Sequence, residues 1–496
     1  MILNLYRIEG PECVHRLRGM YAFAIWDEER QGLFLARDPF GIKPLYYADD
    51  GKTFMAASQV KALLAAGGVD TSPEPAGHVG FFLWGYVPEP YTLYKGIRAL
   101  PAGATLWVEQ GGDHPAPETF CDVAQVIARP APINGETCEK DFTEAFGGAL
   151  RDSVKHPMVS DVPVGVFLSA GLDSTSVAAL AAGISGRPLQ AFTLGFEEYR
   201  GTENDETPPA EMVARQLGAR HNTEWVRGKD FSRDMENIFH AMDQPTIDGV
   251  NTYFVSKAAA VSGLKVALSG LGGDELLGGY PSFRHMPMIM KIAKALHPFG
   301  KAFRLVSEPV IRRFTSPKYA GVFEYGKSLG GAYLLRRGLF MPWELPKILD
   351  ADMVREGWEQ LAPVARINGA IPQGTTPFSA ISAIESTWYM RNMLLRDSDW
   401  ASMAHSLEIR VPLVDIELVR KLAPLLQQRF KPDKKIMARA AWQKDPPKAI
   451  LERPKTGFSV PVRQWLMGEA GSGERGHRSW AKTVYREIGS YRPEAE

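Results

Sequence analysis

The chain has 496 residues, of which 45% are hydrophobic and 23% charged, so it can fold into about two to four domains with buried cores. Lys plus Arg and Asp plus Glu both number 57, which predicts no net attraction to nucleic acid or to an anionic membrane. Its apolar runs are shorter than the roughly 20 residues that cross a bilayer, and no signal-peptide pattern is seen, so we expect a cytoplasmic protein without a membrane partner. Cys13, Cys121 and Cys138 lack the spacing of a disulfide framework or a zinc site.

The first hundred residues alternate short apolar runs with turns. Met20–Trp26, Leu33–Ala36 and Leu45–Tyr47 predict strands of an antiparallel sheet, and Ala104–Glu109 predicts a further β unit. Pro, Gly and polar residues then dominate as far as Glu139, which marks a domain boundary. We therefore assign residues 1–115 to a first domain and residues 116–139 to a linker.

Strand and helix patterns alternate in the next part of the chain. The predicted strands are Val162–Leu168, Leu189–Gly195 and Leu264–Ser269. The predicted helices are Lys140–Val154, Ser174–Ala182, with Ser and Thr caps, and Glu211–Leu217. This alternation predicts an α/β domain with a parallel sheet whose ligands bind at the carboxyl ends of the strands.

Residues 286–470 have mainly helical patterns, and we expect them to cover the α/β core. We assign residues 140–470 to this second domain and residues 471–496 to a polar C-terminal tail.

A loop of small and hydroxyl residues follows the first predicted strand of that domain. Ser169 to Thr175 (SAGLDST) lies between a buried strand and a helix, where backbone N–H groups and the helix N-terminus attract an anion. The loop is suited to a pyrophosphate, although an ordinary capped turn would have a similar sequence. It matches neither GxxxxGK[ST] nor GxGxxG.

A second loop follows another predicted strand, from Leu268 to Tyr280 (LSGLGGDELLGGY). Its glycines allow the backbone to approach a ligand, and Asp274 with Glu275 offers the oxygen ligands that magnesium prefers. Asp173 of the first loop is in a position to share that metal. Alone, such a loop is equally typical of a bend with solvated acids, but the two loops together favour a nucleotide site.

These motifs resemble those of one family. SAGLDS is similar to the SGGxDS loop of the N-type ATP pyrophosphatases, and Leu268 to Tyr280 resembles the LSGxGxDExxGGY segment of glutamine-hydrolysing asparagine synthetases. Ser402–Asp415 and Arg453–Pro461 resemble two later signatures of that family. Leu17–Asp27 and Ala36–Tyr47 resemble the latter half of its class II glutaminase domain, so the resemblance covers nearly the whole chain. It implies an incomplete Ntn-type antiparallel glutaminase sheet, a parallel-sheet ATP pyrophosphatase domain and a helical C-terminal part.

The resemblance also implies site residues, with ATP and Mg²⁺ as cofactors. The residues implied for ATP binding are Leu168, Ser169, Gly171, Asp173, Ser174, Leu194, Ser269 and Gly270. Asp173 and Asp274 are expected to bind the metal, Lys435 to meet a phosphate, and Arg410 to join these three as a catalytic residue. The implied chemistry is the attack of a carboxylate on the α-phosphorus, followed by the attack of ammonia on the acyl-adenylate.

Two residues depart from the family pattern. Ala170 replaces a usual Gly, a small change in a loop that binds through its backbone. Leu271 stands where asparagine synthetases usually have Glu or Asp, and its side chain cannot act as acid, base or metal ligand. The acceptor is therefore aspartate or another carboxylate, such as a sugar uronate or a cell-wall precursor. A β-lactam-forming relative and an ATP-binding pseudoenzyme are further alternatives.

The beginning of the chain also differs from the family pattern. A family glutaminase begins Met-Cys-Gly, with the Cys as nucleophile, whereas this chain begins Met-Ile-Leu-Asn. We expect an N-terminally truncated glutaminase without a nucleophile, and ammonia rather than glutamine as the nitrogen donor. The resemblance allows a homodimer, and the sequence leaves the oligomeric state open.

Overall fold

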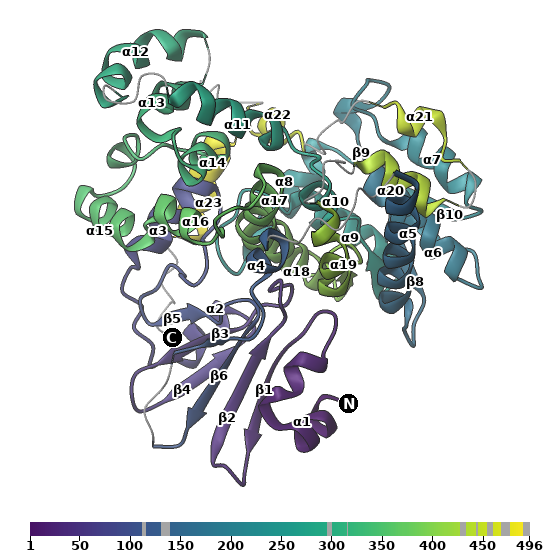
Figure 1. The fold of residues 1–496 in the computed structure, drawn as a ribbon, viewed down its shortest axis with the longest axis horizontal. Helices are drawn as coiled ribbons and strands as arrows, with labels where there is room; N and C mark the ends of the chain where they lie inside the picture. Colours follow the sequence, from purple (N-terminus) through teal and green to yellow (C-terminus); the bar gives the residue numbers. More distant parts are fainter. Residues whose placement is uncertain are drawn as a thin grey trace.

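The structure is a computed structural model that describes residues 1–111, 116–129, 139–294, 300–314, 316–426, 433–442, 445–453, 460–467 and 477–489. Figure 1 shows the N-terminal sheets at the bottom, the parallel sheet with its helices at the right, and a helical part at the upper left. Cys138 lies outside the described residues. Cys13 and Cys121 are free and buried.

The N-terminal part contains two antiparallel sheets. One sheet has the order β1 (Ala22–Asp27), β2 (Gly32–Arg37), β6 (Ala104–Glu109) and β7 (Glu118–Thr119). The other has the order β4 (Phe54–Ala57), β3 (Tyr46–Asp49) and β5 (Ile97–Ala99). The helices of this part are α1 (Ile2–Glu9), α2 (Val60–Ala66) and α3 (Pro75–Trp84). The predicted strands of the first hundred residues are therefore confirmed, but they belong to two antiparallel sheets rather than one.

The sequence analysis missed helix α3, in which all ten residues are buried. A helix that is apolar on every side gives no amphipathic pattern, so periodicity does not reveal it. It packs against α15 (Ala351–Leu361) and against α23 (Arg478–Ile488), where His78 Nδ1 lies 2.7 Å from the Tyr485 hydroxyl. The expected polar tail thus includes a helix with a buried apolar face.

A five-stranded sheet, in which every neighbouring pair is parallel, confirms the predicted α/β domain. Its order is β10 (Arg220–Val226), β9 (Gln190–Phe196), β8 (Val164–Phe167), β11 (Val266–Leu268) and β12 (Glu408–Arg410). The chain passes from β8 to β9 and β10 on one side and then returns to β11 on the other side of β8. The strand order therefore reverses between β8 and β11, and such a switch point opens a crevice at the carboxyl ends.

Helices cover this sheet. Those that connect or flank its strands are α5 (Glu139–Lys155), α6 (Leu172–Ile184), α7 (Thr207–Gln216), α8 (Gly228–Ala241), α9 (Val250–Val261) and α20 (Lys434–Ala441). Helices α5, α6 and α20 pack against one another and lie together in Figure 1. Helix α6 begins at Leu172 with Gly171 as its N-cap, so the predicted Ser and Thr caps are wrong. The Ser174 hydroxyl bonds back into the preceding loop instead.

The remaining residues are mainly helical, as predicted, but β12 was not predicted. The helices are α10 (Gly273–Leu276), α11 (Ser282–Ala293), α12 (Gly300–Phe314), α13 (Val322–Tyr325), α14 (Leu329–Arg337), α16 (Pro363–Gly369), α17 (Pro377–Ile384), α18 (Arg396–Met403), α19 (Ile416–Leu426), α21 (Lys448–Leu451) and α22 (Val462–Met467). A π-helix, Glu385–Leu395, joins α17 to α18. Among the described residues, no helix has both the length and the apolar character needed to cross a bilayer.

The segment 116–139, expected to be a linker, contains β7 and helix α4 (Val123–Ala128). The side chain of Asp122 caps α4, and the helix packs against α17 and α19. The first part of the segment is therefore folded onto both flanking regions. The domain boundaries themselves stay a prediction.

Candidate active site

A pocket of about 660 Å³ lies at the carboxyl ends of β8, β9 and β11. Both loops singled out in the sequence line it, one after β8 and the other after β11. The predicted residues that it brings together are Leu168, Ser169, Gly171, Asp173, Ser174, Leu194, Ser269, Gly270, Asp274 and Lys435. Parallel strands end at the same edge of a sheet, which is why segments about 100 residues apart meet here.

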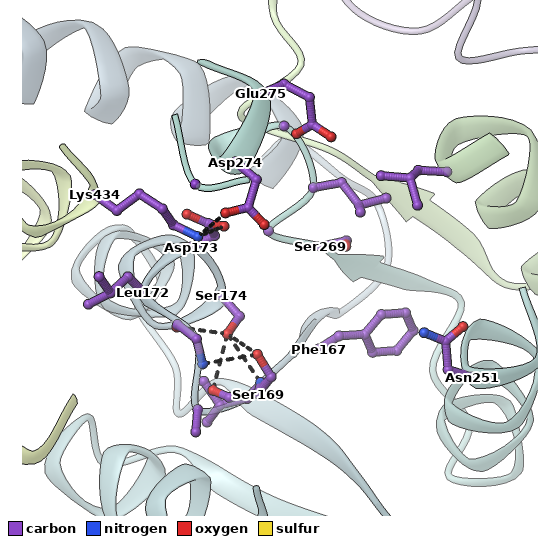
Figure 2. A pocket seen from close by; sticks show the side chains of 18 of the residues that line it. Phe167, Ser169, Leu172, Asp173, Ser174, Asn251, Ser269, Asp274, Glu275 and Lys434 are labelled. Atoms are coloured by element: carbon purple, nitrogen blue, oxygen red, sulfur yellow. Dashed lines mark hydrogen bonds and ion pairs between the residues drawn. The ribbon is translucent and has the colours of Figure 1, made fainter. Parts of the chain in front are cut away.

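Two hydroxyl groups hold the loop after β8 in shape. Ser169 Oγ and Ser174 Oγ lie 2.8 Å apart, and the backbone N–H of Gly171 donates to Ser169 Oγ at 3.2 Å (Figure 2). The Ser174 hydroxyl also lies within hydrogen-bond distance of the Ser169 and Gly171 carbonyl oxygens. The loop therefore presents its hydroxyls at the start of α6, where the helix dipole favours an anion.

Glycines bring the two loops into close contact. A Cβ atom at Gly270 would lie 2.6 Å from the backbone nitrogen of Ser174. A Cβ atom at Gly273 would lie 2.3 Å from Asp173 Oδ1. Both distances are far below van der Waals contact, so the absence of side chains at these positions allows the loop after β11 to lie against the N-terminus of α6.

Replacement of Gly270 by alanine is expected to weaken ATP binding by about tenfold or more, because the added methyl group must displace backbone that lines the site. The measurement is isothermal titration with MgATP. Gly186, in the turn between α6 and β9, provides a control, because a Cβ atom there would meet no atom within 4 Å. Equal affinities of Gly270→Ala and Gly186→Ala would contradict the role of this close approach.

A lysine joins the acids of the two loops. Lys434 Nζ lies 2.5 Å from Asp173 Oδ2 and 2.5 Å from Asp274 Oδ1 (Figure 2). Burial alone would lower the pKa of Lys434, but the two carboxylates raise it above its ordinary value. Lys434 begins helix α20, whose N-cap Asp433 accepts from the backbone N–H of Ile436 at 3.0 Å. The ammonium group thus occupies the position between two carboxylates that a cation would take.

This arrangement fits a magnesium ion bound together with a nucleotide. Among the described residues, no three His, Cys, Asp or Glu side chains gather into a metal cage. Magnesium needs no such cage, since it is usually held by one or two carboxylates together with substrate phosphates. Asp173 and Asp274 provide two carboxylates whose oxygens converge on one cation, Lys434.

A different group of buried side chains lies behind part of the pocket lining. Tyr280 donates a hydrogen bond of 2.8 Å to Glu275, and the guanidinium of Arg337 lies over the Tyr389 ring at 3.7 Å. Arg337 also pairs with the buried Glu385 at 2.7 Å. Burial and then the charge of Asp274 raise the pKa of Glu275 to about 8. At neutral pH, Glu275 is therefore mainly uncharged.

Two further acids, Asp248 and Asp397, line the pocket. Asp397 accepts hydrogen bonds from Thr246 Oγ1 at 2.8 Å and from Trp400 Nε1 at 2.9 Å. Burial, and then the nearby Asp248, raise the pKa of Asp397 from 3.8 to about 8. Asp397 is therefore protonated in the folded protein at neutral pH.

This shift predicts a pH dependence of stability. The unfolded chain ionises Asp397 near pH 4, whereas the folded chain keeps its proton up to about pH 8. The free energy of unfolding should therefore fall between pH 4 and pH 8, by at most about 1.4 kcal/mol per pH unit from this group. Asp397→Asn keeps both hydrogen bonds, since the Thr246 hydroxyl can accept as well as donate.

Melting temperatures of the wild type and Asp397→Asn at pH 5 and pH 8 test this expectation. The variant should gain stability over the wild type as the pH rises from 5 to 8. A constant difference between the two proteins would contradict the raised pKa of Asp397.

The structure does not place the Arg410 side chain in the pocket lining formed by the described residues. Its guanidinium contacts Glu408 and the carbonyl oxygens of Pro157 and Val159. Its own carbonyl accepts from the Ser269 N–H at 2.8 Å. Arg410 therefore supports the loop after β11 through its backbone, and the structure offers no contact for the expected catalytic role of its side chain.

Both departures from the family pattern lie at the pocket. Ala170 and Leu271 are in its lining, and Leu271 packs against the hydrophobic core around β8. Sequence reasoning missed other residues that line it: Glu206, Asp248, Asn251, Tyr389, Asp397, Lys434 and Arg453. Of these, only Lys434 and Arg453 adjoin or belong to segments that the sequence singled out.

Comparisons with known proteins bear on the family of the chain. Residues 145–480 match the family model described as asparagine synthase, and residues 1–119 match a glutamine amidotransferase domain. A putative glutamine-hydrolysing asparagine synthetase of Mycobacterium tuberculosis is 34% identical, covering 99% of this chain and 76% of the relative. Asparagine synthetase 1 of Bacillus subtilis is 30% identical, covering 98% of this chain and 74% of the relative.

Among solved structures, an NH3-dependent NAD synthetase from Campylobacter jejuni has a TM-score of 0.21 and 16% identity over 48% of this chain and 100% of that chain, too low to carry an argument. The two family models agree with the predicted family, and so do the relatives, which match nearly the whole of this chain. The chain belongs to the glutamine-hydrolysing asparagine synthase family.

Proposed function

We propose that this chain forms an amide from a carboxylate, with ATP and Mg²⁺. The acceptor carboxylate attacks the α-phosphorus of ATP, which gives an acyl-adenylate and pyrophosphate. Ammonia then attacks the acyl carbon, and AMP leaves. The observation that carries this proposal is the meeting of Asp173, Asp274 and Lys434 beside the hydroxyl loop at the switch point of the sheet.

Each part of the site has a role in the first step. The loop Ser169–Ser174 is expected to bind the phosphates through its hydroxyls and N–H groups. Asp173 and Asp274 would hold Mg²⁺, which, when bound, neutralises charge that develops on the departing pyrophosphate. Lys434 and Lys435 both line the pocket and add positive charge to it. Such groups, fixed before the reaction, stabilise the transition state.

For the acceptor, we propose aspartate first, because the relatives are named asparagine synthetases. Leu271 supports a second candidate, since an apolar side chain lines the pocket where the family usually has an acid. That second candidate is another carboxylate, such as a sugar uronate or a cell-wall precursor.

For the nitrogen donor of the chain as given, we propose ammonia. Cys13 and Cys121 are exposed by only 0% and 7%, so neither offers a thiol for attack on glutamine. Burial also raises the pKa of both thiols, which opposes formation of a thiolate.

Exchange of labelled pyrophosphate into ATP tests the proposal and identifies the acceptor, because it requires only the first step. Aspartate, glutamate, glucuronate and diaminopimelate are added one at a time with MgATP. Exchange that depends on one of them supports the ligase function and names the acceptor class. Tight ATP binding without exchange for any carboxylate would instead favour an ATP-binding pseudoenzyme.

A further inference from the structure

Helices α11 and α12 expose large apolar side chains. On α11, Met288 and Ile292 are 61% and 43% exposed, and on α12, Leu305 and Val306 are 62% and 79% exposed. Such side chains are usually buried, so their concentration on two consecutive helices indicates an interaction surface.

The exposed apolar residues of α12 share a face with basic residues. Lys301, Leu305 and Glu308 recur at helical spacing and lie along one line of α12, and Val306 with Arg313 lies along a second line about 100° further round the helix. Both Lys301 and Arg313 are exposed. The outer side of α12 therefore carries the apolar Leu305 and Val306, with Lys301 and Arg313 towards its ends and the half-exposed Glu308 between them.

The other side of α12 attaches it to the protein. Arg304 Nε lies 2.6 Å from Glu324 Oε2, and the Arg304 guanidinium lies over the Trp343 ring at 4.6 Å. Phe303 and Phe323 stack edge to face, with their ring centroids 4.7 Å apart. Figure 1 shows α12 at the periphery of the helical part, beyond α13. One face of α12 is thus packed, and the described apolar side chains Leu305 and Val306 point to the exposed side.

The same region concentrates positive charge. Residues 282–314 contain seven Lys and Arg residues and a single acid, Glu308, in a chain whose net charge is zero. On α11, Arg284 and Lys291 are exposed on the side that carries Met288 and Ile292. The total charge of the chain is balanced and predicts no attraction to anionic surfaces, but residues 282–314 carry a local excess of positive charge.

We propose that the outer faces of α11 and α12 bind the surface of an anionic lipid bilayer. In this position, Leu305 and Val306 enter the boundary between headgroups and acyl chains, and Lys301 and Arg313 contact lipid phosphates. Exposed apolar side chains beside basic residues provide the two attractions, hydrophobic and electrostatic, that hold a helix at an anionic membrane interface. The proposal is independent of the amide-forming chemistry.

Charge argues against a second copy of the chain as the occupant. In a two-fold symmetric dimer the same surface patch is used by both subunits, so this face would meet itself. Lys301 and Arg313 would then approach the same basic residues of the other copy, which is unfavourable. An anionic bilayer complements both the charge and the apolar centre.

Co-sedimentation of the full chain with vesicles tests the proposal. Vesicles of equal parts phosphatidylcholine and phosphatidylglycerol are compared with phosphatidylcholine alone, and glycerol phosphate is added as a soluble competitor. The wild type should sediment with the anionic vesicles only, less so at high salt, and glycerol phosphate should not release it.

Two double variants separate the apolar and electrostatic contributions. Leu305→Ser with Val306→Ser, and Lys301→Glu with Arg313→Glu, should each reduce binding about tenfold or more. Val261→Ser provides a matched control, since Val261 is 84% exposed on α9. Melting temperature and MgATP binding confirm that every variant is folded.

Four results would overturn the proposal. The first is a wild type that stays in the supernatant with anionic vesicles. The second is double variants that bind as well as the wild type. The third is full release by glycerol phosphate, which would indicate a site for a soluble phosphate. The fourth is a dimer that Leu305→Ser with Val306→Ser dissociates, which would make this face a contact between two copies.

Discussion

Asp173→Asn is expected to lower pyrophosphate formation from MgATP by about 100- to 1000-fold, with the fold unchanged. Asp173 and Asp274 both contact Lys434 at 2.5 Å, so the two carboxylates are positioned to share a cation. Asparagine keeps the size of the side chain but removes the negative charge that would hold Mg²⁺. The measurement is the initial rate of pyrophosphate release with saturating MgATP and the acceptor found by exchange.

An exposed aspartate controls for the loss of a negative charge elsewhere. The Asp352 side chain is 79% exposed on α15, where it pairs with Arg355. Asp352→Asn should leave the rate within about twofold of the wild type, as is usual for a surface change. A rate for Asp173→Asn within threefold of the wild type would contradict the role of Asp173 in holding Mg²⁺ for pyrophosphate formation.

Lys434→Met is expected to lower the same rate by about 100-fold and to make thermal stability depend on Mg²⁺. Without the ammonium group, the like charges of Asp173 and Asp274 face each other. Water screens them little, because the two side chains are only 14% and 19% exposed. This repulsion should lower the free energy of unfolding by about 1–2 kcal/mol in EDTA. Magnesium binds only the folded arrangement and should restore part of the loss.

Melting temperatures in EDTA and in MgCl₂ provide the measurement. Lys435→Met is the matched control, because Lys435 lines the pocket but is expected to meet a phosphate rather than the two acids. It should weaken ATP binding without making the melting temperature depend on Mg²⁺. A Lys434→Met protein whose melting temperature does not respond to Mg²⁺ would contradict a cation site between Asp173 and Asp274.

The parallel sheet and its two loops could be predicted because their signals are local. The buried run before Ser169 and the run before Ser269 each have the length of a strand, and glycines or small residues follow directly. Strands that alternate with helices imply a parallel sheet, and a parallel sheet brings both loops to one edge. The meeting of Asp173 with Asp274 follows from topology alone.

The lysine between the two acids could not be predicted with the same certainty. Lys434 and Lys435 are adjacent, and successive residues of a helix point about 100° apart, so the choice depends on how α20 packs against α5 and α6. That packing is a tertiary property. The resemblance implied a phosphate contact for Lys435, which lines the pocket, and implied no role for Lys434, which the structure places against both acids.

Three other residues that line the pocket had even less signal in the sequence. Tyr389 lies in a π-helix, Asp397 in the helix that follows, and Asp248 about 150 residues earlier. A π-helix changes the number of residues per turn, so a period of 3.6 does not indicate which side chains share a face. No spacing in the sequence connects these three residues, and only the fold brings them together.

Transfer of oxygen between the substrates tests the central claim most directly. The acceptor carboxylate is labelled with ¹⁸O and incubated with MgATP, ammonium chloride and this chain, and the products are analysed by mass spectrometry. Attack of the carboxylate on the α-phosphorus predicts one labelled oxygen in AMP, unlabelled pyrophosphate and an amide product. Label in inorganic phosphate together with ADP would show attack on the γ-phosphorus and would contradict the proposed function of this pocket.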